Sequence, residues 1–288
     1  ADDKIILRPG HQRGQNVRQA GDDLHRGDRV LAAGRRLNAA DLGLLASLGL
    51  AEIDARRRPV VAFFSTGDEL RGVGQPLDAG QIHDSNRYTL YGLLERAGVE
   101  IRDMGVIPDD AGAVREALRT AAGYSDLVIT SGGVSVGEAD YIKRVLAERG
   151  TLHFGRVAVK PGRPLTFGTL ERTLFFGLPG NPVSVMATFI LFVRRALQRL
   201  SGETPVPLPR LKARCRSALR KVPGRMEFQR GILTWAETGE LVVDTTGLQD
   251  SHVLSSMSKA NCFIVLPLES DGVEAGDRVE TIPLHGLL

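Results

Sequence analysis

Acidic residues, hydroxyls and glycines gather in three short segments of the sequence, each directly after an apolar run typical of a buried strand. The segments are 65–69 (STGDE), 108–110 (PDD) and 130–140 (TSGGVSVGEAD). Ligands of open α/β sheets bind outside the carboxyl ends of the strands, so we expect these segments to meet at one edge of a sheet. Their side chains suit a ligand that carries hydroxyls or phosphates, or a hard cation.

The glycine-rich segment 130–140 predicts phosphate recognition. Successive glycines allow backbone N–H groups to point at an anion, and the start of the following helix adds a favourable dipole. The segment lacks the lysine of a GxxxxGK[ST] loop and is not a GxGxxG fingerprint, so it carries neither nucleotide motif. Asp140 either caps the helix or holds Mg²⁺ beside the phosphates, because a carboxylate repels a phosphate unless a cation lies between them.

The other two segments rely on carboxylates. Gly67 permits a sharp turn, after which Asp68 and Glu69 either bind a hydroxyl or a cation or remain the solvated acids of a turn. Asp110 is expected to cap the next helix, which leaves Asp109 as the functional candidate of its pair.

Two later segments add cations and a rigid turn. Segment 160–164 (KPGRP) places two cations around a turn, which suits a phosphate or another oxyanion, or else a solvated surface turn. Segment 177–182 (GLPGNP) joins a strand to an apolar helix, with Asn181 predicted as the N-cap and Pro182 as the first helical residue. The backbone of this segment could line the same site.

Strand-like and helix-like runs alternate over residues 59–203. The predicted strands are 60–65, 99–107, 127–130 and 173–176, and the predicted helices between and after them are 84–97, 110–122, 140–148 and a long apolar helix ending near residue 200. This order is typical of an α/β domain with a mainly parallel sheet flanked by helices.

The rest of the chain has a different pattern. Prolines at 205, 207 and 209 indicate an extended linker, and short alternating runs predict a small all-β domain over residues 204–288. Before residue 59, the sequence predicts a short helix at 41–48 and a strand within 25–34.

Composition excludes several classes of protein. With 288 residues, 42% apolar and 25% charged, the chain has the make-up of a folded globular protein. The formal net charge of +3 is interspersed along the chain, so we expect no nucleic-acid partner. The longest apolar run, 183–193, is shorter than a bilayer span, and no signal peptide precedes it, so we expect a cytoplasmic protein without a membrane partner. Cys215 and Cys262 fit neither a disulfide framework nor a zinc site.

Five motifs in this order and spacing resemble those of the molybdopterin molybdenumtransferases, the MoeA and gephyrin E-domain family. They are STGDEL, GQIHDSNR, SGGVSVGEADY, VKPGRP and GLPGNPVSV, and the similarity extends over nearly the whole chain. The resemblance implies a molybdopterin-binding α/β domain followed by a C-terminal β domain. It also implies that molybdenum from molybdate is inserted into adenylylated molybdopterin with release of AMP, in a Mg²⁺-dependent reaction carried out by a homodimer. Molybdopterin adenylyltransferase and the enzymes that accept the finished cofactor are the partners expected.

The same resemblance assigns roles to individual residues. Asp140, Asp109 and Glu69 would be catalytic, and Asp140 with Glu138 would hold the metal. Lys160, Arg163 and Arg156 would contact molybdate or phosphates. The residues expected to bind the pterin dinucleotide or shape the floor of its pocket are Thr66, Gly67, Asp68, Ser131, Gly132, Gly133, Ser135, Gly137, Pro179 and Pro182.

The sequence departs from the family at its N-terminus, where an MDGYA-like motif is absent. We therefore expect residues 1–27 to be a remnant of the elongated second domain and 28–58 to be part of the first. Two other functions stay open from the residues: a Mg²⁺-dependent pyrophosphatase related to CinA, built on the same phosphate-binding domain, and a peptide-binding scaffold without catalysis.

Overall fold

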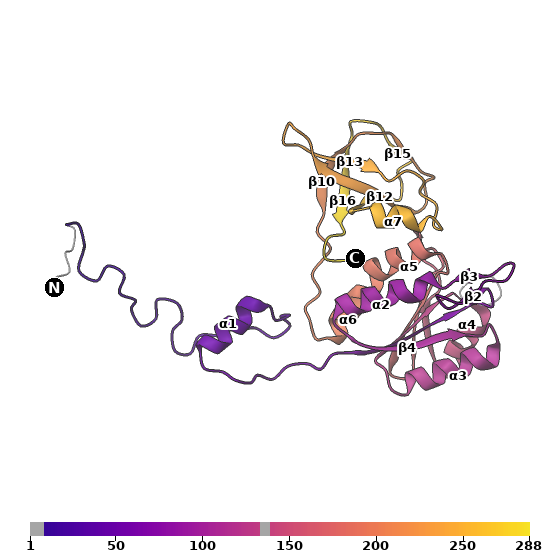
Figure 1. Cartoon of the computed structure of the whole chain (residues 1–288), viewed down its shortest axis with the longest axis horizontal. Coiled ribbons are helices and arrows are strands. Elements are labelled where there is room, and N and C mark those ends of the chain that lie inside the picture. Colours follow the sequence, from indigo (N-terminus) through magenta and orange to yellow (C-terminus); the bar gives the residue numbers. More distant parts are fainter. Residues whose placement is uncertain (1–8, 133–138) are drawn as a thin grey trace. The chain divides into compact units, whose positions relative to one another are not determined.

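The computed structural model describes residues 9–132 and 139–288, apart from the side chains of residues 139–141 and 143. The chain forms two compact units, one ending at Ile53 and the other running from Asp54 to Leu288. Figure 1 shows the second unit as a layered α/β domain joined to a β domain. Within the described residues, no helix combines the length and the apolar character needed to cross a membrane.

Helix α1 (Ala39–Ser47) is the regular element within residues 9–53, and it confirms the helix predicted at 41–48. Asn38 and Asp41 form a reciprocal capping box, in which each side chain accepts a hydrogen bond from the backbone N–H of the other residue. The strand predicted within 25–34 is wrong. That stretch consists of turns and irregular backbone, and Gly27 and Gly34 reverse the chain at positive φ angles of 98° and 85°.

The larger sheet of the second unit has the strand order β4-β1-β5-β9-β8-β6. Strands β4 (Glu100–Ile107), β1 (Val60–Thr66), β5 (Leu127–Ser131) and β9 (Thr173–Leu178) run parallel. Strands β8 (Thr166–Leu170) and β6 (Gly150–Phe154) are antiparallel additions at one edge. The predicted mainly parallel sheet is therefore confirmed.

Helices cover both faces of this sheet because its central strands are apolar on both sides. On one face, Val61 and Phe63 of β1 pack in the core that contains residues of α2 (Ser85–Ala97) and of α5 (Pro182–Thr188). On the other face, Ala62 and Phe64 pack with residues of α3 (Ala111–Ala122) and α4 (Ala139–Arg149). Helix α5 continues through a π-helical turn, η1 (Phe189–Val193), into α6 (Arg194–Leu200), which confirms the long apolar helix.

Capping residues set the boundaries of α2 and the start of α3, and the Asp110 cap of α3 is the one predicted. Asp84 caps α2 through a 3.0 Å hydrogen bond from Arg87 N, and Gly98 ends the helix at a φ of 72°. Asp110 caps α3, since its Oδ1 accepts from the backbone N–H groups of both Gly112 and Ala113 at 2.9 Å.

A second sheet, with the order β13-β10-β16-β14-β12-β7, forms the C-terminal domain. Its strands are β10 (Leu211–Cys215), β12 (Met226–Trp235), β13 (Leu241–Thr245), β14 (Cys262–Leu266), β16 (Arg278–Pro283) and β7 (Val159–Lys160). The domain also contains the pair β11 (Leu219–Arg220) and β15 (Gly272–Val273) and the short helix α7 (Leu254–Lys259). Strand β7 precedes the linker in sequence, so its pairing with β12 ties the α/β domain to the C-terminal domain.

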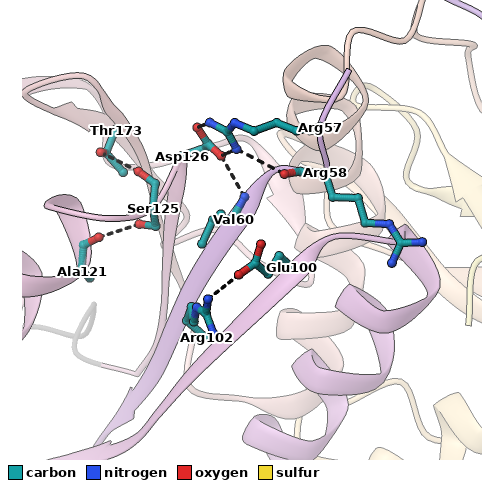
Figure 2. A network of polar contacts seen from close by, with 9 residues as sticks. All are labelled: Arg57, Arg58, Val60, Glu100, Arg102, Ala121, Ser125, Asp126 and Thr173. Carbon is teal, nitrogen blue, oxygen red and sulfur yellow. Dashed lines mark hydrogen bonds and ion pairs between the residues drawn. The ribbon is translucent and has the colours of Figure 1, made fainter. Parts of the chain in front are cut away.

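A polar network fixes the strands at the edge opposite the predicted site (Figure 2). Asp126 accepts two 2.6 Å hydrogen bonds from the guanidinium of Arg57 and one of 2.8 Å from Val60 N, which holds the chain entering β1 against β5. Glu100 and Arg102 form an ion pair along β4. The hydrogen bond from Arg57 lowers the pKa of Asp126 below its ordinary value.

Candidate functional site

Strand register brings the three predicted segments to one edge of the sheet. Ser65 near the end of β1 pairs with Ser131 of β5, which in turn pairs with Leu178 of β9. On the other side of β1, Thr66 pairs with Ile107 at the end of β4. The convergence expected from the sequence is therefore confirmed at the carboxyl ends of four parallel strands.

Four buried hydroxyls lie at this edge, two on each face of the sheet. Ser65, Thr66, Thr130 and Ser131 are at most 4% exposed, and none of their side-chain oxygens has a hydrogen-bond partner among the described residues. Side chains alternate between the faces of a strand, so the serines lie on the α2/α5 face and the threonines on the α3/α4 face. Buried hydroxyls are normally hydrogen-bonded, so polar groups of a bound ligand could complete the bonds that the described residues do not supply.

Gly132 allows the backbone of the glycine-rich segment to pass close to β1. Its φ is 86°, and a Cβ at this position would clash with the carbonyl oxygen of Thr66. Glycine is required here on both grounds. Gly133, Ser135, Gly137 and Glu138, which follow in the sequence, lie outside the described residues. Asp140 lies in the first turn of α4, and its side chain is not among those that the structure describes.

The predicted acids of β1 and β4 meet at the rim of the site. Asp109 donates its backbone N–H to Asp68 Oδ1 at 3.2 Å, although the two residues are 41 positions apart. The carboxylate of Glu69 folds back over Gly67, where an added Cβ would lie 2.6 Å from Glu69 Oε2. Strands β2 (Leu70–Arg71) and β3 (Ile82–His83) pair just beyond this turn.

A pocket of about 580 Å³ opens beside these acids, lined among others by Gly67, Asp68, Arg71 and Arg87. Its two arginines are already engaged. Arg87 Nε lies 2.9 and 2.8 Å from the carboxylate oxygens of Asp103, and this hydrogen bonding raises the pKa of Arg87. Arg71 donates to the carbonyl oxygens of Asp68 and Leu70 at 3.0 and 2.8 Å.

The turn expected to form the floor of the site joins β9 to α5, at the sheet edge where Leu178 pairs with Ser131. Pro179 is buried and Pro182 is the first residue of α5, as predicted, but the Asn181 side chain makes no capping hydrogen bond. Asn86 of α2 reaches across to this turn and donates to Gly180 O at 2.6 Å, and its other side-chain atom, Oδ1, is buried without a partner among the described residues. Asn86 is not among the residues predicted for the site, and its only signal in the sequence is its place in the GQIHDSNR motif.

A second pocket, of about 420 Å³, is lined by three arginines, Arg156, Arg163 and Arg225, together with Pro223 and Gly224 among others. Arg225 was missed because no motif surrounds it. It precedes β12, and only the pairing of β12 with β7 brings it to the two arginines expected from the sequence.

Lys160 is held at the same junction by a buried acid. Its Nζ lies 3.0 Å from Glu227 Oε1, and the Glu227 side chain is only 5% exposed. Gln229 donates a second hydrogen bond to the same oxygen at 3.1 Å. The cation is therefore balanced by an acid of the C-terminal domain that the sequence did not reveal.

No cluster of three or more potential metal ligands occurs among the residues that the structure describes. The two residues expected to hold Mg²⁺ are not part of that set: Glu138 lies outside the described residues, and so does the side chain of Asp140. Two described acids, Asp68 and Asp109, are neighbours through the hydrogen bond from Asp109 N to Asp68 Oδ1, and carboxylate oxygens are donors that Mg²⁺ prefers.

Comparison with protein families matches three parts of the chain. Residues 62–199 match a probable molybdopterin binding domain, residues 212–284 the MoeA C-terminal region (domain IV), and residues 1–49 the MoeA N-terminal region (domains I and II). The match to the MoeA C-terminal region favours this family over the pyrophosphatase that the residues had left open.

Curated relatives and solved structures agree. The molybdopterin molybdenumtransferase of Haemophilus influenzae is 46% identical over 275 residues, which cover 95% of this chain and 68% of the relative. The molybdopterin molybdenumtransferase of a Nostoc species is 36% identical, over 94% of this chain and 63% of the relative. Gephyrin of Dictyostelium discoideum is 35% identical, over 93% of this chain and 42% of the relative. A molybdopterin biosynthesis MoeA protein of Pyrococcus horikoshii superposes with a TM-score of 0.77 at 29% identity, over 91% of this chain and 63% of that one. The chain thus spans about two thirds or less of the length of these proteins. It belongs to the molybdopterin molybdenumtransferase family, whose members are transferases of molybdenum-cofactor biosynthesis.

Proposed function

We propose that this chain inserts molybdenum from molybdate into adenylylated molybdopterin and releases AMP. The observation that carries the proposal is the two pairs of buried hydroxyls at the carboxyl ends of β1 and β5, which have no hydrogen-bond partner within residues 9–132 and 139–288. A ligand rich in phosphate and amide groups would supply the hydrogen bonds that these hydroxyls lack. Membership of the family supports adenylylated molybdopterin as that ligand.

The pterin dinucleotide would lie along the strand ends. Thr66 and Ser131 supply hydroxyls, Gly132 keeps the backbone open to a close approach, and Asn86 offers an Oδ1 to which no described residue donates a hydrogen bond. Gly67, Pro179 and Pro182 shape the pocket, and Gly133, Ser135 and Gly137 would extend the cradle with backbone N–H groups.

Molybdate would bind at the arginine pocket. A tetrahedral dianion is matched by several guanidinium groups, whose planar N–H donors form paired, charge-assisted hydrogen bonds. Arg156, Arg163 and Arg225 line this pocket, and Lys160 lies at the adjoining β7–β12 junction, with part of its charge balanced by Glu227. Two anion sites then serve the two anionic substrates.

Mg²⁺ would be held by Asp140 and Glu138, with oxygens of the substrate phosphates completing its coordination. When bound, the ion neutralises charge on the phosphoanhydride, so that cleavage to AMP becomes easier. Asp109 and Glu69 stand at the rim, where their carboxylates can accept hydrogen bonds from the substrate or from the attacking water. We further propose that the protein works in the cytoplasm as a homodimer and exchanges its substrate and product with molybdopterin adenylyltransferase and with cofactor-accepting enzymes.

Calorimetric titration of adenylylated molybdopterin, with and without Mg²⁺, tests this function. We expect Mg²⁺ to tighten binding to the parent chain but not to the Asp140→Asn variant, because the variant loses a charged metal ligand. Asp110→Asn is the matched control: Asp110 caps α3, and asparagine caps a helix equally well, so its Mg²⁺ response should match the parent. Equal responses from all three proteins would contradict the metal assignment, and absence of binding to the parent would contradict the function.

A further inference from the structure

Arg230 of β12 is 1% exposed, and it is the largest side chain that the described fold buries completely. Its guanidinium donates to the Ser256 hydroxyl at 2.9 Å and to three backbone carbonyls, those of Gln249 at 2.9 Å, Leu248 at 3.1 Å and Asp250 at 2.9 Å. All four acceptors are uncharged. Burying a cation against neutral acceptors costs free energy, and burial lowers the pKa of Arg230, so the arrangement calls for an explanation.

The arginine holds one loop, residues 247–253, against β12. Its own backbone joins the clamp, because Arg230 N donates to Gln249 Oε1 at 2.7 Å and Arg230 O accepts from Gln249 Nε2 at 3.1 Å. Ser256 at the start of α7 closes the arrangement by donating to Val253 O at 2.6 Å. The position of the loop is therefore set by a single side chain with its immediate partners.

The clamped loop supplies the cap that α5 lacks. Ser251, the residue after the clamped carbonyls, accepts a hydrogen bond from Val183 N at 3.2 Å, and Val183 is the second residue of α5. Asn181 stands at the N-cap position of α5 without a side-chain capping bond. A backbone carbonyl of the C-terminal domain thus satisfies a free N–H at the helix start. Figure 1 shows α7 beside α5 at this junction.

The start of α5 is also the end of the site floor. Gly180, two residues before Pro182, is bonded to Asn86, and a Cβ added to Gly180 would lie 3.9 Å from Gly132 Cα. A shift of the helix start therefore reaches the turn that lies against the glycine-rich segment. Every link between Arg230 and this turn is a hydrogen bond or a short stretch of covalent backbone.

We propose that Arg230 is a positioning residue of the ligand site. It acts through the loop 247–253 on the start of α5 and on the turn between β9 and α5. The C-terminal β domain then contributes to the site at the sheet edge as well as to the arginine pocket. The hydrogen-bonded link from Arg230 to α5 does not depend on the proposed function, and only its effect on ligand affinity rests on that function.

Amide hydrogen exchange at Val183 tests the link directly. Arg230→Met removes the four donors at similar length, Arg230→Lys keeps a cation with fewer donors, and Lys221→Met is the matched control. Lys221 is also a buried cation of the C-terminal domain, 8% exposed, but it holds the carbonyls of Leu268 and Ser270 at 3.2 and 2.5 Å, away from α5. We expect Val183 to exchange about tenfold faster or more in Arg230→Met, an intermediate rate in Arg230→Lys, and the parental rate in the control.

Calorimetry with adenylylated molybdopterin completes the test. We expect affinity to fall by about tenfold in Arg230→Met, to recover partly in Arg230→Lys and to be unchanged in Lys221→Met. An unchanged exchange rate at Val183 in Arg230→Met overturns the proposal. If exchange is faster in Arg230→Met but the parent chain binds no adenylylated molybdopterin, only the proposed function is overturned. Faster exchange with undiminished affinity overturns the positioning role. If Arg230→Met does not fold, Ser256→Ala, which removes one acceptor, should show the same changes to a smaller extent.

Discussion

Lys160 and Glu227 form an ion pair of 3.0 Å that joins the α/β domain to the C-terminal domain, and the two partners differ sharply in exposure. The lysine side chain is 43% exposed, whereas the glutamate side chain is 5% exposed. Their backbones are neighbours as well, because Glu227 pairs with Lys160 where β7 adds to the second sheet. The pair is therefore both a structural joint and the electrostatic setting of a predicted anion ligand.

This difference in exposure predicts an asymmetric response to mutation. Lys160→Met leaves a buried carboxylate with Gln229 as its remaining partner, so we expect a loss of about 2–4 kcal/mol in the free energy of unfolding. Glu227→Gln leaves a lysine that can return to water, and we expect a loss of only about 1 kcal/mol. Urea denaturation of the two variants measures both values. Equal losses would show that the buried carboxylate is better solvated than its exposure suggests.

Much of the α/β domain could be predicted because its signals are local. Apolar runs of strand length, amphipathic stretches and the Asp110 cap marked the elements to within one or two residues. The convergence of the polar segments followed from the parallel order of the strands. Even where the Asn181 cap failed, the helix began at the predicted Pro182, because the proline ring alone favours that position.

The parts that escaped prediction depend on pairing between distant segments. Arg225 joins Arg156 and Arg163 only because β12 adds alongside β7, and no sequence pattern encodes which strands become neighbours. The same holds for Ser251, whose carbonyl caps a helix 68 positions earlier in the chain. The strand predicted within 25–34 failed for the opposite reason: its residues favour a strand locally, but the structure gives them no partner strand.

Cys262 and Cys215 should be unreactive in the folded protein. Both are fully buried, and burial raises the pKa of Cys262 to about 12 and raises that of Cys215 as well. Because only the thiolate reacts, we expect no alkylation by iodoacetamide at pH 8 under native conditions and modification of both cysteines in denaturant. Mass spectrometry of intact protein counts the modifications. A rapid native reaction would mean that the second sheet opens locally around these strands.

Asp126 should make stability depend on acid pH. Its folded-state pKa is lowered by Arg57, so its contribution is present above the ordinary aspartate pKa of about 3.9 and disappears as pH falls through the lower folded value. We expect Asp126→Asn to lower the free energy of unfolding by about 1–2 kcal/mol at pH 7, with the gap to the parent closing at more acid pH.

The control for this prediction is an ion pair with little burial. Glu274, beside Arg220, has a side chain that is 64% exposed, so Glu274→Gln should change stability by less than about 0.5 kcal/mol at either pH. Urea denaturation at pH 7 and pH 3 compares the three proteins. A gap between parent and Asp126→Asn that widens toward acid pH would contradict the assignment.

Gly132 should be intolerant of even one methyl group. Gly132→Ala introduces a Cβ that clashes with Thr66 O and places alanine at a φ of 86°. Gly74 has the same φ of 86° with nothing within 4 Å of an added Cβ, so Gly74→Ala carries the conformational cost without the clash. We expect about 1 kcal/mol of destabilisation in Gly74→Ala and about 2–4 kcal/mol in Gly132→Ala.

The difference between these two glycine variants isolates the close approach of the glycine-rich segment to β1. Thermal or urea unfolding measures stability, and titration with adenylylated molybdopterin under native conditions measures the site. We expect Gly132→Ala to weaken binding by about tenfold or more, because relieving the clash moves the backbone away from the Thr66 and Ser131 hydroxyls, while Gly74→Ala binds as the parent does. Equal effects of the two substitutions on both stability and affinity would show that backbone strain, rather than contact with β1, accounts for glycine at position 132.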